Sequence, residues 1–191
     1  MVGNIPNFTK IDLLRCFVRL NKNIGRKELS KELGLGEGTV RTILNILKSK
    51  KLLDSTKKGH FLSNKGIATL NSILECISAP KSVSIHNLYP SLKKVAVVIK
   101  NIKSLNNLYK LRDLAVKNGA DGAIILKFEG RLYAPESDYE HNYQDLEKYF
   151  ELINNDVVAV AFSDNVKNAE NGAFAIAIKL CSNLKKFIND I

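Results

Sequence analysis

Two short helices joined by a glycine-containing turn constrain the fold of this chain more than any other feature of its sequence. The spacing of apolar residues predicts the first helix over residues 26–33 and the second over residues 39–50. Gly34 follows the first helix directly and is suited to end it in the left-handed conformation. Because neither helix can bury its apolar face alone, the pair must pack against another helix. Thr9 is a suitable N-cap for such a helix, which we expect over residues 10–20.

The second of these helices carries a polar face with the chemistry of a nucleic-acid reader. Arg41, Thr42, Asn45 and Lys48 fall on the side opposite its apolar residues. Arginine can form two hydrogen bonds to guanine and asparagine two to adenine, whereas threonine and lysine suit phosphates and thymine methyl groups. Thr39 adds a further polar side chain at the start of the helix. A plain solvated helix face would carry the same residue types, so the neighbouring segments must distinguish the two interpretations.

A short hairpin is predicted directly after this helix. Residues 52–56 and 60–62 are expected as two strands around a basic tip at residues 57–59. The lysines of such a tip, together with His60, would contact phosphates or the minor groove and add affinity rather than sequence recognition. The residues that we expect to contact DNA are Arg26, Lys27, Thr39, Arg41, Thr42, Asn45, Lys48, Lys57, Lys58 and His60.

The order of these elements resembles a known class of transcription regulators. The runs Glu28–Leu35, Gly38–Arg41, Leu44–Leu53 and Gly59–Gly66 are similar to bacterial and archaeal winged helix-turn-helix regulators. The resemblance covers about residues 8–77, which are similar both to the MarR/ArsR layout and to the DNA-binding end of sugar-responsive repressors. The resemblance implies a winged helix that binds double-stranded DNA. It also implies a homodimer, because helix-turn-helix proteins commonly bind two-fold sites.

The charge of the chain is concentrated in the same region. Residues 1–80 hold 14 Lys and Arg against 6 Asp and Glu, a net charge of +8 out of +10 for the whole chain. A basic module joined to a nearly neutral one favours a polyanion as partner, although charge also serves general solubility. A fourth helix over residues 64–77 is followed by Pro80, which indicates a boundary. We therefore expect a DNA-binding domain at residues 1–78 and a second domain at residues 79–191.

The second domain alternates apolar strands with helices. Continuous apolar runs predict strands over residues 95–99, 123–128 and 156–162, each buried on both faces. Helices are expected over residues 105–117 and, as one long helix, over residues 169–188. The alternation favours parallel pairing, and a hairpin after the second strand adds an antiparallel component. The expected fold class is α/β (α+β overall), an N-terminal winged helix-turn-helix followed by a mixed-sheet α/β domain. Further elements are expected at residues 83–88 (edge strand), 131–134 (hairpin strand) and 143–153 (helix).

No motif in the second domain identifies a ligand. Glycine-rich phosphate-binding motifs, a serine nucleophile motif and a metal-spaced histidine pair are absent from the sequence, so we expect no catalytic residue, no metal and no cofactor. If the strands were parallel, a small-molecule effector would bind beyond their carboxyl ends. The residues there are Lys100, Asn101, Lys127, Glu129, Ser163 and Asp164. The run Ser163-Asp164-Asn165 before a long helix can also be plain helix capping, which is the interpretation that we favour for it.

The remaining sequence features bear on location and on the alternatives. Cys16, Cys76 and Cys181 are far apart and predict buried free thiols in a reducing cytoplasm. A signal-peptide pattern and a membrane-length apolar run of ~20 residues are both missing, so we expect a cytoplasmic protein without a membrane partner. The segment Phe162–Ala173 resembles part of an uncharacterised archaeal family in which such a domain follows a winged helix.

The sequence therefore favours a DNA-binding transcription regulator that is not an enzyme. Its second domain would sense a small molecule, dimerise, or do both. Two alternatives stay open at this point. One is a protein-interaction subunit of a transcription complex that uses a winged helix for protein contacts, and the other is an enzyme fused to a winged helix.

Overall fold

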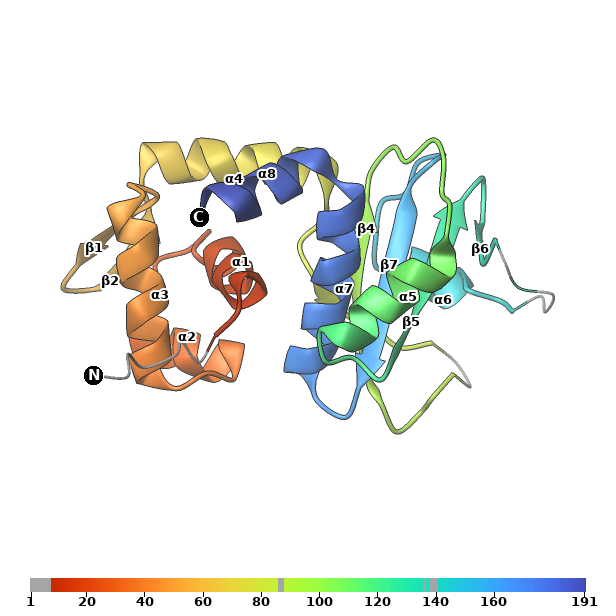
Figure 1. Ribbon diagram of the computed structural model, residues 1–191, viewed down its shortest axis with the longest axis horizontal. Helices are drawn as coiled ribbons and strands as arrows, with labels where there is room; N and C mark the ends of the chain where they lie inside the picture. The colour runs from red at the N-terminus through yellow and green to blue at the C-terminus, as the bar shows by residue number, and fades with distance from the viewer. Residues whose placement is uncertain (1–7, 86–87, 136, 138–140) are drawn as a thin grey trace. The chain divides into compact units, whose positions relative to one another are not determined.

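The computed structural model describes residues 8–85, 88–135, 137 and 141–191. The chain divides into two compact units (Figure 1). Unit 1 is Met1–Ile73 with Lys186–Ile191, and unit 2 is Leu74–Lys185. The division falls inside a helix, shortly before the boundary expected between residues 78 and 79, and the last residues of the chain return to unit 1. Along the described part of the chain, no helix has the length and apolar character needed to cross a bilayer.

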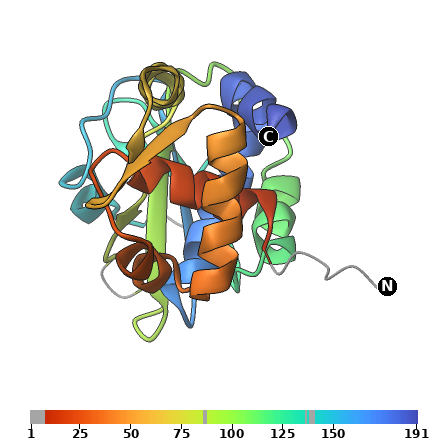
Figure 2. The same ribbon diagram turned by 90° about the vertical axis from the view of Figure 1, so that its left-hand side faces the viewer.

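Unit 1 is built from three helices, a two-stranded hairpin and most of a fourth helix. The helix after Gly25 has the predicted bounds, and Gly34 ends it with a φ of 62° in the left-handed region. The next helix begins at Glu37 rather than at Thr39, with Gly36 as its N-cap. Figure 2 looks onto this helix and the hairpin beside it. The elements are α1 (Lys10–Arg19), α2 (Arg26–Leu33), α3 (Glu37–Ser49), β1 (Leu53–Thr56), β2 (Gly59–Leu62) and α4 (Asn64–Cys76).

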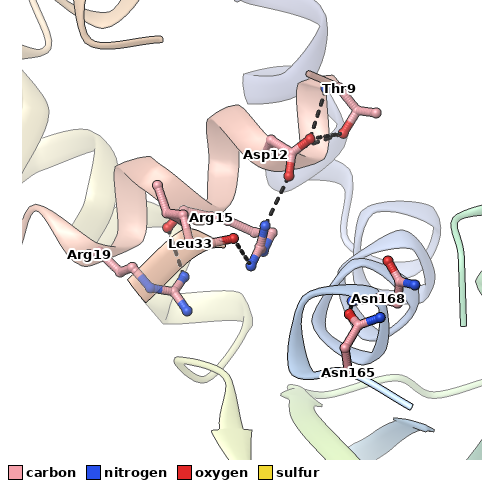
Figure 3. A network of polar contacts seen from close by, with 7 residues as sticks. All are labelled: Thr9, Asp12, Arg15, Arg19, Leu33, Asn165 and Asn168. Carbon is pink, nitrogen blue, oxygen red and sulfur yellow. Dashed lines mark hydrogen bonds and ion pairs between the residues drawn. The ribbon is translucent and has the colours of Figure 1, made fainter. Parts of the chain in front are cut away.

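A buried ion pair joins the start of α1 to the end of α2 (Figure 3). The Arg15 guanidinium, 1% exposed, lies 2.9 Å from an Asp12 carboxylate oxygen. It also donates a hydrogen bond of 3.0 Å to the carbonyl oxygen of Leu33, in the last turn of α2. Asp12 in turn accepts from the Thr9 backbone N–H, which completes the capping box of α1. The pair therefore satisfies buried charges and a helix-end carbonyl together, and it fixes how α1 and α2 pack.

The end of the chain completes the core of unit 1. Phe187, near the end of α8 (Ser182–Asp190), stacks on Phe17 of α1 with 4.9 Å between ring centroids. Lys10 donates a hydrogen bond to the Ile188 carbonyl oxygen at 2.8 Å, and Lys50 donates one to the Asp190 carbonyl oxygen at 2.6 Å. We expected Phe187, Ile188 and Asp190 in the second domain, because local sequence patterns do not show which core such a segment joins.

The predicted single helix over residues 169–188 is wrong. The structure has two helices, α7 (Val166–Leu180) and α8, with extended backbone at Cys181 between them (φ −103°, ψ 114°). Apolar residues keep helical spacing through the break, so the periodicity gave no sign of it. Asn165 caps α7 by accepting a hydrogen bond of 2.9 Å from the Asn168 backbone N–H (Figure 3).

Unit 2 is built on a five-stranded sheet in the order β3-β4-β7-β5-β6. All of its strand pairs are antiparallel, so the expectation of a mixed sheet with parallel pairing is wrong, whereas the α+β class is confirmed. The two strands linked by α5 (Leu108–Lys117) do run in the same direction, but β7 lies between them and pairs with both. The strands are β3 (Lys81–Ser82), β4 (Lys93–Ile99), β5 (Gly122–Phe128), β6 (Leu132–Tyr133) and β7 (Val157–Ser163).

Both faces of this sheet are covered, as the continuous apolar runs predicted. Helices α5 and α7 pack on one face (Figure 1). Ile85, Tyr143 and Leu146 cover the other face, where they join the inward side chains of β4, β5 and β7 in one apolar cluster. This face is therefore covered by irregular segments and the short α6 (Gln144–Glu147), whereas a parallel sheet commonly has helices on both faces. The helix predicted over residues 143–153 is limited to α6.

Candidate nucleic-acid interface

The polar face of α3 is exposed, as its spacing predicted. Its apolar side chains, which include Val40, Ile43 and Leu47, are fully buried in unit 1 and fix the rotation of the helix about its axis. Thr39 is only half-buried and lies at the margin of the exposed face. The exposed side chains on the opposite face are Arg41, Thr42, Asn45 and Lys48.

Three of these side chains, those of Arg41, Asn45 and Lys48, are free to bind a partner. Arg41 and Asn45 make no hydrogen bond or ion pair within the part of the chain that the structure describes. They are four residues apart, so they lie one above the other on the same side of the helix. Thr42 differs, because its hydroxyl donates a hydrogen bond of 3.2 Å to the Gly38 carbonyl oxygen of the preceding turn. The face therefore offers one guanidinium and one amide group that no neighbour occupies.

The hairpin is attached to the segment that precedes α2. Ile24 and His60 form an isolated antiparallel bridge, with backbone hydrogen bonds of 3.1 and 2.9 Å in the two directions. Gly59 has a φ of 139°, and a Cβ there would lie 2.6 Å from the side chain of Asn23, so glycine is required for this close approach. The bridge holds β2 next to the start of α2. Lys57 and Lys58 are exposed at the tip of the hairpin.

Three positively charged or ionisable side chains from three elements gather beside the exposed face of α3. The pKa of His60 in β2 is lowered from its ordinary value by burial, and then by the positive charges of Arg26 in α2 and Lys48 in α3. The Ser55 hydroxyl oxygen lies 2.8 Å from His60 Nδ1 across the hairpin. The charges of Arg26 and Lys48 near His60 make this part of the surface positive, which is the electrostatic condition for binding an anion.

This surface also contains one acidic side chain that the sequence did not indicate. The Glu37 carboxylate, in the first turn of α3, lies 3.6 Å from the Arg26 guanidinium, and both side chains are about half exposed. A phosphate bound to Arg26 would have to replace this ion pair. Arg26 begins α2 and Glu37 begins α3, so only the packing of α2 against α3 brings them together. No pattern in the local sequence indicates this ion pair.

The structure does not gather the six residues suggested as an effector site. The carboxyl ends of β4 and β5 lie at one end of the sheet, and the residues there are Lys100, Asn101, Lys127 and Glu129. Ser163 lies at the opposite end of the sheet, because β7 runs in the other direction. The antiparallel order of β7 causes this separation, since its carboxyl end lies beside the beginnings of its neighbours. Ser163 donates a hydrogen bond of 3.1 Å to Asp164, and Asn165, the third residue of this run, caps α7, which agrees with the capping interpretation.

A cavity in unit 2 was also not foreseen. It has a volume of about 690 Å³ and lies beside the β5–β6 hairpin, where Glu129 is the one residue shared with the suggested effector site. Most of its described lining residues lie outside helices and strands, where no periodicity in the sequence indicates them. Within the described ranges, no group of three or more His, Cys, Asp or Glu side chains could hold a metal ion. The cavity is lined by residues such as Arg131, Tyr133, His141, Asn142 and Glu147.

Comparison with known proteins gives matches to both units. Residues 10–68 match the family of PH0730-like N-terminal domains, and residues 91–180 match a domain of unknown function, DUF4443. The hypothetical protein PH0730 from Pyrococcus horikoshii OT3 is 29% identical, with a TM-score of 0.82, over 96% of this chain and 99% of that chain. The chain is similar to that protein over almost its whole length. No curated protein matches the chain at a significant level.

Two further solved structures match more weakly. S. agalactiae BusR in complex with its busAB-promotor DNA is 13% identical, with a TM-score of 0.26, over 93% of this chain and 96% of that chain. An IclR transcriptional regulator from Alicyclobacillus acidocaldarius is 8% identical, with a TM-score of 0.30, over 91% and 96%. TM-scores of this size carry no structural argument. These matches also do not include a MarR or ArsR protein, so that layout stays an expectation.

Proposed function

We propose that unit 1 is a winged helix-turn-helix that binds double-stranded DNA, and that the protein is a cytoplasmic transcription regulator. In this proposal α3 enters the major groove and the β1–β2 hairpin is the wing. The observation that carries it is the convergence of Arg26, Lys48 and His60, from α2, α3 and β2, beside the exposed face of α3. A positive surface around an exposed helix with free base-reading groups is the arrangement that major-groove recognition requires.

The roles within the surface follow from reach and charge. Arg41 and Asn45 are the groups that we assign to base edges, because both are exposed and free of internal hydrogen bonds and ion pairs. Lys48, one turn further along, and Lys57 and Lys58 on the wing would bind phosphates and set the affinity. Arg26 would exchange Glu37 for a phosphate when DNA binds.

Unit 2 has the regulatory part in this proposal. We propose that it senses a small molecule, mediates homodimerisation, or does both, since two-fold DNA sites are commonly bound by dimers. The cavity beside the β5–β6 hairpin is a better candidate for an effector-binding site than the six residues at the two ends of the sheet, because the cavity is one continuous space. We propose no reaction for unit 2, and substrate turnover that is independent of DNA would contradict this part.

The salt dependence of DNA binding tests the proposal directly. Fluorescence anisotropy with a labelled mixed-sequence duplex should give a log affinity that falls with log salt by about 0.9 per phosphate neutralised, hence a slope of about −4 to −5 if Arg26, Lys27, Lys48, Lys57 and Lys58 all take part. The double variant Lys57→Ala, Lys58→Ala should lower the magnitude of this slope by about 2.

A matched control removes the same charge elsewhere. Lys103 and Lys117 are exposed lysines of unit 2, and their replacement by alanine should leave both affinity and slope unchanged. If the native chain does not bind at about 50 mM salt, where electrostatic binding is strong, the proposal is wrong. Equal losses in the two double variants would also exclude the wing as the contact.

A pH dependence follows from the environment of His60. Its pKa is lowered in the free protein, so the imidazole is largely neutral at pH 7. A phosphate beside it would favour the charged form, so DNA binding should take up a proton, and affinity should rise as the pH falls from 7.5 toward 6. Titrating the anisotropy over this range should show the rise in the native chain and in His141→Asn, but not in His60→Asn. A rise that survives in His60→Asn would assign the proton to another group.

A further inference from the structure

The start of α3 carries a carboxylate on the same side of the helix as the two groups assigned to base edges. Glu37, Arg41 and Asn45 are spaced by four residues, so their side chains follow one another along one side of α3. All three are exposed. In helix-turn-helix proteins the first residues of the recognition helix contact base edges. An α3 that lies in the major groove therefore presents Glu37 to the bases as well as Arg41 and Asn45.

The surface around Glu37 is open. Glu37 lies between Gly36 and Gly38, and a Cβ at either glycine would meet no packed neighbour within 4 Å among the described residues. Neither position carries a side chain that would keep a partner at a distance. The first turn of α3 can therefore approach the floor of a groove closely.

The Glu37 carboxylate has one partner in the free protein. One of its oxygens lies 3.6 Å from the Arg26 Nε, and the described part of the chain gives it no second partner. In the proposed complex Arg26 binds a phosphate, so the carboxylate loses this partner while the negative charges of DNA come near. A carboxylate that is desolvated without a donor is costly, so Glu37 must accept a hydrogen bond from the bases.

The major groove offers few groups that can donate to a carboxylate. An ionised carboxylate only accepts hydrogen bonds. Guanine presents two acceptors and thymine presents one, whereas the amino groups are those of cytosine N4 and adenine N6. Adenine also presents the acceptor N7 beside its amino group, which repels a carboxylate, but cytosine presents the donor alone. Cytosine is therefore the base that matches Glu37.

We propose that Glu37 is a third base-reading side chain, which selects cytosine at the base pair that faces the start of α3. The proposal rests on the proposed function, because it needs α3 in the major groove. Along α3, Glu37 only accepts hydrogen bonds, Arg41 only donates them and Asn45 does both. The three side chains thus match cytosine, guanine and adenine in turn. Glu37 also acts against guanine and thymine at its own position, since their acceptors would face a carboxylate.

Selection from a library of randomised duplexes tests the proposal on the full chain. The native chain and Glu37→Gln each select sequences, which are then compared position by position. The native chain should select cytosine at one position where Glu37→Gln shows little preference, because the glutamine amide both donates and accepts. On the native operator, thymine in place of this cytosine should weaken binding of the native chain by about 10-fold, and of Glu37→Gln by less than about 3-fold.

Glu28→Gln is the matched control. Glu28 lies in the first turn of α2, where its carboxylate is 3.4 Å from the Lys22 ammonium, so the variant removes the same charge from the neighbouring helix. Both variants should bind a scrambled duplex at least as tightly as the native chain, since each lacks one negative charge. Only Glu37→Gln should lose the preference for cytosine. Both should melt close to the native chain, because exposed ion pairs add little stability.

Three outcomes would overturn the proposal while leaving DNA binding by unit 1 in place. The native chain and Glu37→Gln could select the same sequences, the position that changes could hold a base other than cytosine in the native operator, or Glu28→Gln could lose the preference equally. Absence of binding by the native chain at about 50 mM salt would instead overturn the proposed function, and this inference with it. Affinity for the scrambled duplex thus separates the two failures.

Discussion

Replacing Arg41 by alanine is expected to weaken binding to a selected operator by about 10- to 100-fold, the value of one bidentate contact to guanine. Arg41 is exposed on α3, and its guanidinium has no hydrogen-bond or ion-pair partner among the described residues. The substitution therefore removes a group that folding does not use, and the unfolding temperature should not change. The operator is selected from a genomic duplex library, and affinities are compared with a scrambled duplex at the same salt.

Two further variants separate base reading from charge. Arg41→Lys keeps the positive charge but loses the planar fork of donors, so it should bind the scrambled duplex normally and lose most of the preference for the operator. Thr42→Ala should have a small effect, since the Thr42 hydroxyl already bonds to the Gly38 carbonyl oxygen of its own helix. An Arg41→Ala variant that retains the native operator preference would exclude this side chain from base recognition.

Gly66→Ala is expected to destabilise unit 1 by about 3 kcal/mol, as overpacking against rigid backbone does. A Cβ at Gly66, in the first turn of α4, would overlap the Leu52 carbonyl oxygen and lie 3.2 Å from the Leu62 Cβ. The carbonyl cannot withdraw freely, because it accepts a hydrogen bond of 3.2 Å from the Ser63 N–H. Urea unfolding followed by circular dichroism measures the loss as a lower midpoint at unchanged slope.

Gly38→Ala is the matched control for this substitution. Gly38 lies in the first turn of α3, and a Cβ there would meet no atom within 4 Å. Alanine should therefore raise the free energy of unfolding by about 0.5 kcal/mol, because it lowers the entropy of the unfolded chain and favours helix. Similar losses in the two variants would show that the contact with Leu52 does not explain the effect of Gly66→Ala.

The parts of the fold that depend on local periodicity were predictable from the sequence. The bounds of α2, the left-handed Gly34 and the exposed face of α3 all follow from apolar spacing and glycine chemistry within one turn of helix. The hairpin was predicted for the same reason, since its strands are close in sequence. These elements also carry most of the candidate DNA-binding residues, so most of the proposed surface could be predicted from the sequence alone.

The features that depend on distant segments were not predictable. Apolar runs show that β4, β5 and β7 are buried on both faces, but not which strand lies between which. The prediction of parallel pairing failed because β7 enters between β4 and β5 from the far end of the chain. The Glu37–Arg26 ion pair likewise arises only when separate elements pack together.

The stacking of Phe187 on Phe17 has a consequence for the order of events during synthesis. Residues 8–73 are translated before unit 2, yet the core that they form lacks the α8 contribution until Lys186–Ile191 have also been translated. Phe17 is therefore uncovered while unit 2 emerges and folds. A nascent chain stalled after residue 78 would expose an apolar surface that chaperones bind, and release of the last residues would close it. Synthesis of unit 1 thus begins before that of unit 2 and is completed after it.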